Sequence, residues 1–184
     1  MNRFAKILFA SALGLGLANT AVQDAMTKMV GGAAMYPTKN IVENAVNSKD
    51  HTTLVAAVKA AGLVDTLAGA GPFTVFAPTN AAFKKLPPGA VNGLLKPEMK
   101  DQLTGVLTYH VVPGRMTSAD LAKAVKDGGG QASLKTVEGE PLTVTRKGST
   151  IMVTDAKGGT ARVTIADVMQ SNGVIHVVNK VLMP

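Results

Sequence analysis

The spacing of apolar residues changes near the middle of this 184-residue chain. In the first half, apolar residues recur three and four positions apart, as they do on one face of a helix. From about residue 133 onward they fall in short runs separated by polar turns, which predicts strands. Helices followed by a series of antiparallel strands together predict an α+β domain.

The helical segments carry start and stop signals. Ser48 and Asp50 are capping candidates before an apolar face, and Gly62 follows that face as a stop. Pro97 suits the first turn of a second long helix, whose apolar face includes His110. Helices are therefore predicted over 41–46, 48–61, from Thr79 or Asn80 onward, over 97–112 and over 118–126.

The strand candidates are short and bounded by turn residues. Residues 73–77 form an apolar run between Gly71-Pro72 and Pro78. Later strands are predicted over 133–137, 141–147, 150–154, 160–166 and 173–182, with turns at "EGEP", "RKGS" and "AKGG". The closing stretch "NGVIHVVNKVLMP" is apolar on both faces, which predicts a central strand that is buried on both sides.

The first residues have the layout of a secretory signal peptide. Arg3 and Lys6 precede the uncharged run "ILFASALGLGLA", which is shorter than the roughly 20 residues of a membrane-spanning helix. Small residues follow near position 18, and a retained membrane anchor is the alternative. We expect a signal peptide over 1–21, a leader arm over 22–37 that could lie on the domain, and one domain over 38–184.

Composition narrows the possible functions. The absence of cysteine excludes disulfides, thiolate metal ligands and thiol nucleophiles. Aromatic residues make up 4% of the chain, which argues against base-stacking sites. The formal charge is +7, and removal of Arg3 and Lys6 lowers it by two. Because the remaining cations are scattered, we expect no nucleic-acid partner, and acidic polysaccharide or lipid head groups fit better.

Three boxes of sequence carry a resemblance to a known family. They are "FTVFAPTNAAF" at 73–83, "TYHVV" at 108–112 and "SNGVIHVVNKVLMP" at 171–184. In this order and at these separations, they resemble the fasciclin-like (FAS1) adhesion domain, a secreted module. The resemblance covers about 38–184. Its motif positions are Phe73, Thr74, Val75, Phe76, Ala77, Pro78, Thr79, Asn80, Tyr109, His110, Asn172, Gly173, His176 and Asn179.

The resemblance implies both a fold and a type of function. The implied fold is a wedge of two β-sheets with a cluster of helices packed against them. The implied function is adhesion or extracellular binding, without catalysis. Relatives usually have Asp where this chain has Asn179, so a salt bridge or cation contact at that position is in doubt. In some animal relatives the tyrosine-histidine region is implicated in integrin binding, and only its structural role is expected at Tyr109 and His110.

The three histidines do not have the spacing of a metal or catalytic site. His51, His110 and His176 form no HxH or HxxxH pair, so we expect no metal. His110 and His176 lie among apolar residues and are expected to be neutral core residues with hydrogen-bonded rings. The competing hypothesis is a His176-centred active site with Ser171 and Asp167, but no GxSxG elbow presents a serine.

The remaining motifs have structural interpretations. Thr79 and Asn80 are expected to cap a helix, with a recognition loop as the alternative. Asn172-Gly173 predicts the turn that begins the final strand. The glycines at 128–130 predict a flexible loop, because the Lys-Ser/Thr of a phosphate-binding loop is missing.

These observations favour an exported, non-enzymatic adhesion or binding module, secreted or periplasmic, with no cofactor. Its partner is expected to be an envelope or extracellular protein, a polysaccharide or a second copy of itself. After signal cleavage no integral membrane anchor is expected. The alternative is a periplasmic small-molecule or lipid-binding protein with an apolar pocket, for which the nine methionines would be suited. A hydrolase ranks last because no nucleophile and base are paired.

Overall fold

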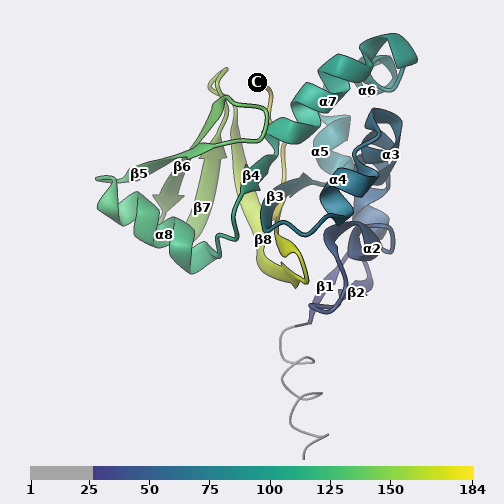
Figure 1. Cartoon of the computed structure of the whole chain (residues 1–184). Helices are drawn as coiled ribbons and strands as arrows, with labels where there is room; N and C mark the ends of the chain where they lie inside the picture. The colour runs from purple at the N-terminus through teal and green to yellow at the C-terminus, as the bar shows by residue number, and fades with distance from the viewer. Residues whose placement is uncertain (1–26) are drawn as a thin grey trace, which may run out of the picture.

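A mixed sheet of seven strands runs through the centre of the molecule, in the order β4-β3-β9-β8-β7-β6-β5 (Figure 1). The computed structural model describes residues 27–184, and the predicted signal peptide lies outside them. The strands are β3 (Phe73–Pro78), β4 (Val111–Pro113), β5 (Gln131–Lys135), β6 (Pro141–Lys147), β7 (Thr150–Thr154), β8 (Thr160–Gln170) and β9 (Gly173–Val178). Only β3 and β9 pair in parallel; the other neighbours in the sheet are antiparallel.

The long strand β8 joins two halves of this sheet. Its first residues pair with β7, and most of its length pairs with β9 through two register shifts. Asp167, within the second register shift, has a positive φ of 56°, and β8 bends where such bulges occur. The Val137 N–H, after β5, donates to the Val111 carbonyl of β4 at 2.8 Å, so the two ends of the sheet meet. The predicted α+β wedge is confirmed.

Most helices cover one half of the sheet. They are α2 (Ile41–Ala45), η1 (Lys49–His51), α3 (Thr52–Ala61), α4 (Val64–Ala68), α5 (Asn80–Lys84), α6 (Ala90–Leu94), η2 (Pro97–Met99) and α7 (Lys100–Tyr109). The other half is covered by α8 (Ser118–Asp127), seen on the left of Figure 1. Within residues 27–184, no helix combines the length and hydrophobicity needed to cross a membrane.

The helix ends follow from local capping. Asn40 and Glu43 form a capping box at the start of α2, and Thr117 and Asp120 form another at the start of α8. The αL residue Gly62 ends α3, as predicted.

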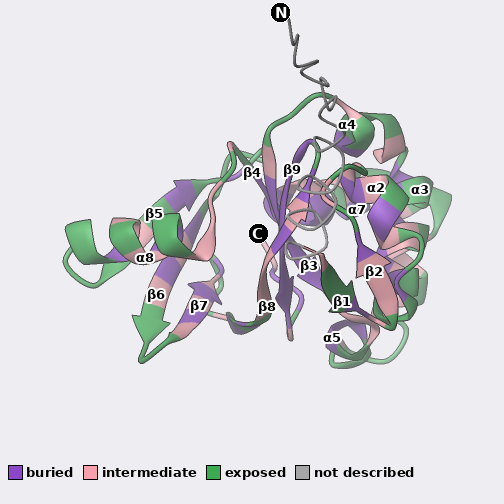
Figure 2. Ribbon diagram, turned by 90° about the horizontal axis from the view of Figure 1, so that it is seen from below, coloured by how far each residue is buried: buried purple, intermediate pink, exposed green. Residues whose placement is uncertain are grey.

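Two apolar cores lie on opposite sides of β3 and β9. Val75 and Ile175 face the core under α2, α3, α4, α5 and α7, whereas Phe76 and Val178 face the core between α8 and β5–β8. All six residues of β9 are buried (Figure 2). The prediction of a central strand with two apolar faces is therefore confirmed, and the alternation arises because successive side chains point to opposite faces.

Residues 28–35, within the predicted leader arm, form a hairpin of β1 (Lys28–Val30) and β2 (Ala33–Met35). Val30 and Met35 are buried in the core under the helices. Sequence periodicity could not show this, because each strand has only three residues.

Several predicted boundaries were wrong. The helix predicted over 97–112 ends at Tyr109, because Val111 and Val112 pair with β3 as strand β4. The last strand ends at Val178 and pairs in parallel with β3, so the later strands are not all antiparallel. Residues 131–135 form β5 in place of 133–137, and β8 continues to Gln170.

Replacing Met35 with Ala should lower the free energy of unfolding by about 2–4 kcal/mol, because the side chain is 2% exposed in the core. Met29→Ala in the same hairpin is the control. That side chain is 62% exposed, so its loss should change stability by less than about 0.5 kcal/mol. Urea denaturation measures the free energy of unfolding of both variants. Equal, small effects would show that the hairpin contributes nothing to the core.

Candidate functional site

His176 lies at the centre of β9 and is fully buried. Its Nε2 atom is 2.8 Å from the Met116 carbonyl, to which it donates, and its Nδ1 accepts the Asp167 N–H at 3.3 Å. The ring stacks on Phe76, its register partner in β3, with centroids 5.7 Å apart. Burial lowers the pKa of His176, so the imidazole is neutral and connects β9 to the β8 bend and to the loop before α8.

Asp167 and Ser171 do not form a catalytic group with His176. The Asp167 carboxylate accepts hydrogen bonds from the Ser118 N–H and hydroxyl at the start of α8. Ser171 is exposed, and its carbonyl accepts from the Arg115 guanidinium at 3.2 Å. Both ring nitrogens of His176 are occupied by backbone groups. No nucleophile–base–acid series is therefore assembled from these three residues.

Tyr109 and His110 are both buried: Tyr109 lies in the core between α8 and β5–β8, and His110 borders the core under the helices. The Tyr109 hydroxyl donates to the Pro141 carbonyl at 3.1 Å and accepts the Ala156 N–H at 2.9 Å, while burial raises its pKa. His110 Nδ1 donates to the Val106 carbonyl at 2.7 Å. Its Nε2 accepts the Leu182 N–H at 3.0 Å, so the ring holds the C-terminal segment against α7.

The first box forms β3 and the start of α5. Thr74 is buried, and its hydroxyl donates to the Gly114 carbonyl and accepts the Met116 N–H. Thr79 is the N-cap of α5 and accepts the Ala82 N–H at 3.2 Å. Phe73, Val75, Phe76, Ala77 and Pro78 form the rest of the strand.

Asn80 serves a different helix from the one that was predicted. Its Oδ1 accepts the Thr53 N–H at 3.0 Å, and its Nδ2 donates to the Lys49 carbonyl and the Thr52 hydroxyl. Asn80 therefore fixes the start of α3 against α5, while Thr79 alone caps α5.

Asn172 has a larger role than the predicted turn. Its Oδ1 accepts the Ile41 N–H at 3.0 Å, and its Nδ2 donates to the Leu67 and Gly69 carbonyls at 2.7 Å each. The side chain is buried and connects the β8–β9 turn to α2 and α4. Sequence reasoning missed these contacts because the partners are backbone groups more than one hundred positions away.

Gly173 follows Asn172 where two backbones nearly touch. A Cβ at this position would lie 2.1 Å from the Phe73 carbonyl oxygen. Only glycine allows β9 to start this close to β3.

Asn179 completes the pairing of β8 and β9. Its Oδ1 accepts the Arg162 N–H at 2.8 Å, and its own N–H donates to the Arg162 carbonyl at 3.2 Å. A carboxylate oxygen could accept the same bond. The Asn that replaces the expected Asp therefore keeps the geometry and removes a negative charge.

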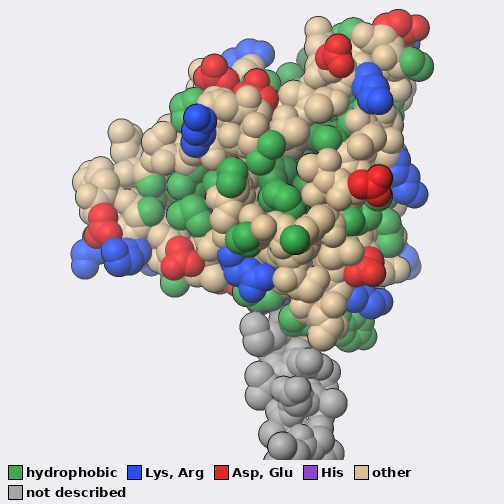
Figure 3. Space-filling model, viewed as in Figure 1, with side chains coloured by type: hydrophobic (Ala, Val, Ile, Leu, Met, Phe, Trp, Pro, Cys, Tyr) green, Lys and Arg blue, Asp and Glu red, His purple; other side chains and the backbone are tan. Residues whose placement is uncertain are grey.

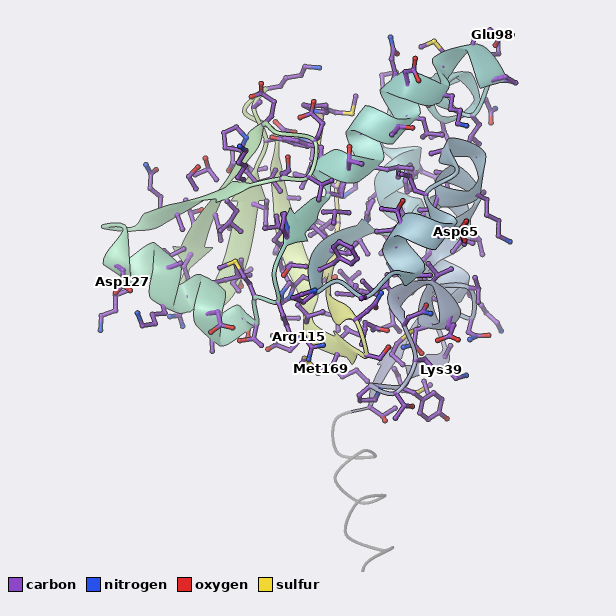
Figure 4. All side chains as sticks on the ribbon, in the orientation of Figure 1. Lys39, Asp65, Glu98, Arg115, Asp127 and Met169 are labelled. Carbon is purple, nitrogen blue, oxygen red and sulfur yellow. The ribbon has the colours of Figure 1, made fainter. Side chains whose placement is uncertain are left out.

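Within residues 27–184, the charged side chains do not converge on a reaction centre. Figure 4 shows Asp65, Glu98 and Asp127 at separate points of the periphery, with Arg115 near Met169 at the lower end of the sheet. Across the described part of the chain, no three His, Asp or Glu side chains are placed to hold a metal ion.

Burial lowers the pKa of His110 from 6.5 to about 4. Between these values the unfolded chain binds a proton that the native protein does not, so the free energy of unfolding falls as pH decreases. His110 alone should account for about 3 kcal/mol of that loss between pH 7 and pH 4. Urea denaturation of the wild type and His110→Gln at both pH values isolates this effect from the carboxylates. Equal losses in the two proteins would contradict it.

Comparison with known proteins agrees with the three boxes. A model of the fasciclin domain family matches residues 49–184. Protein sll1483 of Synechocystis sp. is 44% identical over 191 residues, which cover 100% of this chain and 99% of that protein. The cell surface glycolipoprotein MPB83 of Mycobacterium bovis is 34% identical over 181 residues, which cover 95% of this chain and 73% of that protein.

A solved structure has the same fold. It is a FAS1 domain pair from the insect cell adhesion molecule Fasciclin I, with a TM-score of 0.72 and 18% sequence identity. The match covers 85% of this chain and 57% of that chain. Because the family model spans most of the chain and a relative matched over nearly its full length is 44% identical, this chain belongs to the fasciclin domain family.

Proposed function

We propose that this chain is an exported, non-enzymatic binding module that attaches to an acidic polysaccharide of the cell envelope or its surroundings. Export is supported by the signal-like N-terminus and by MPB83, whose name places that relative at the cell surface. A binding role is supported by the family and by the burial of His110 and His176, whose ring nitrogens are all engaged within the protein.

The observation that carries the choice of partner is a group of cations around Asn179. The Lys85 ammonium, just after α5, donates to the Asn179 carbonyl at 2.9 Å, the backbone of Arg162 in β8 pairs with Asn179, and Lys180 follows in the chain. All three cations are exposed. We call Lys85, Arg162 and Lys180 the Asn179 cluster. Its members come from the end of α5, from β8 and from the segment after β9.

One carboxylate lies beside this cluster. Asp155 is near Lys180 and offsets part of its charge, but it forms no ion pair with Lys180, and its oxygens accept the backbone N–H groups of Lys157, Gly159 and Met183. In residues 27–184 the only ion pair joins Lys123 to Asp127, on α8. Figure 3 shows cations and acids interspersed on one face, so the net positive charge is not concentrated there.

An acidic polysaccharide fits these features because repeated carboxylate or sulfate groups can contact several separate cations at once. Such attraction acts over a distance and weakens with salt, since ions screen exposed charges beyond about 10 Å at 0.1 M. The Asn at 179 matters here because the usual Asp would place an anion among the three cations.

Asn179→Asp should weaken binding of the purified protein to an immobilised acidic polysaccharide, such as alginate, by about threefold or more at low salt. The added carboxylate keeps the hydrogen bond to Arg162 and only changes the charge. Gln131→Glu, at an exposed position of β5, is the control because it makes the same charge change away from the cluster. Biolayer interferometry at several salt concentrations measures both variants.

Equal effects of the two variants would exclude the Asn179 cluster as the contact. Binding that does not depend on salt, or equal binding to a neutral glucan, would contradict an acidic polysaccharide as partner. Concentration-dependent self-association in sedimentation, without polysaccharide binding, would favour a second copy of the chain.

A further inference from the structure

An apolar cavity lies between the helices and the sheet, in the core that contains Val75 and Ile175. Its volume is about 50 Å³, and its walls come from β2, α2, α3, α4, β3, the start of β4 and their neighbours. The lining is almost wholly aliphatic and includes Ile41, Val58 and Val64. It extends toward solvent, because Val42, Val55 and Val64 are half-buried and Lys59 is exposed.

One polar side chain in this lining has an unused atom. His51 is 3% exposed, and its Nδ1 lies 2.9 Å from the Ser48 hydroxyl. Its Nε2 is buried and has no hydrogen-bond partner; the Ala77 backbone is near but forms no bond of regular geometry. His110 also lines the cavity, yet both of its nitrogens are engaged by Val106 and Leu182.

The state of the His51 ring restricts what can bind. Burial lowers its pKa, so the ring is neutral near pH 7. The Ser48 hydroxyl can either donate to Nδ1 or accept from it, which leaves Nε2 as a donor or an acceptor. A hydroxyl group satisfies Nε2 in either case, because it can both donate and accept.

A single water molecule is a poor occupant of this position. A buried water usually makes about three hydrogen bonds. Apart from Nε2, the walls around it are mainly aliphatic. A charged group is also disfavoured, since no buried counter-charge lines the cavity.

We propose that this cavity binds the end of one unbranched aliphatic chain that carries an uncharged hydroxyl group, with the hydroxyl on His51 Nε2. The cavity is smaller than the roughly 150 Å³ engineered cavity that admits a benzene ring, which excludes a ring and leaves the narrow end of an unbranched chain. The half-buried valines between α2, α3 and α4 provide the way in. The Asn179 cluster is not part of the lining, so this site and the polysaccharide contact can fail separately.

The test uses protein with ¹⁵N-labelled histidine, because the three imidazoles report separately. Titration with 1-octanol should shift the His51 ring resonances saturably while those of His176, outside the cavity, stay in place. Octanoate should bind at least tenfold more weakly, because its carboxylate would be buried without a cation. His51→Leu should lower octanol affinity at least threefold and leave the binding of xenon, which has no polar group, unchanged.

Val55→Phe should block the entrance and abolish the octanol shift. Val137→Phe is the matched control, because Val137 is 43% exposed and lies outside the cavity. If a variant is unstable, the octanol titration of the unsubstituted protein still tests the proposal. His51 resonances that do not respond up to the solubility limit of octanol would overturn the proposal. So would equal affinity for octanoate, or an octanol shift that persists in a folded Val55→Phe protein.

Discussion

The parallel pairing of β3 with β9 is the interaction on which the rest of the structure depends. These two strands separate the two apolar cores, and their alternate residues fill one core or the other. The pairing begins where Gly173 lies against Phe73, with no room for a side chain. Asn172, at the same point, attaches the helices through α2 and α4. The apolar side chains of both cores can therefore be buried only when the backbones of β3 and β9 meet at this close contact.

The buried polar residues orient the parts that surround this pair. His176 connects it to the β8 bend, His110 connects α7 to the C-terminal segment, and Asn80 sets α3 against α5. Each is a short polar side chain whose partners are mostly backbone groups. A neutral imidazole suits such a position because it has one donor and one acceptor on opposite sides of a rigid ring. Both ring nitrogens of His110 and His176 are used in this way, so neither is free to exchange a proton with a bound molecule.

The sequence predicted the features that depend on local pattern. The apolar faces of α3 and α7, the two-sided burial of β9 and the boxes of the fasciclin domain could be recognised from residue types and spacing. Strand β4 was missed because "HVVP" continues the helical pattern of α7 and becomes a strand only by pairing with β3. The hairpin was missed because it is too short to have a period. Contacts between distant segments cannot be predicted from a single sequence. They determine the partners of Asn172, the Asn179 cluster and the unused nitrogen of His51.

Native-state hydrogen exchange tests the central position of the β3–β9 pair most directly, because it gives an opening free energy for each amide. Amides within this pair, such as those of Val75 and His176, should exchange only with the free energy of global unfolding. Amides of β6 and β7, at the far side of the sheet, should open at equal or lower free energy. Exchange of β3 and β9 at a lower free energy than β6 and β7 would show that the fold does not depend on this pair.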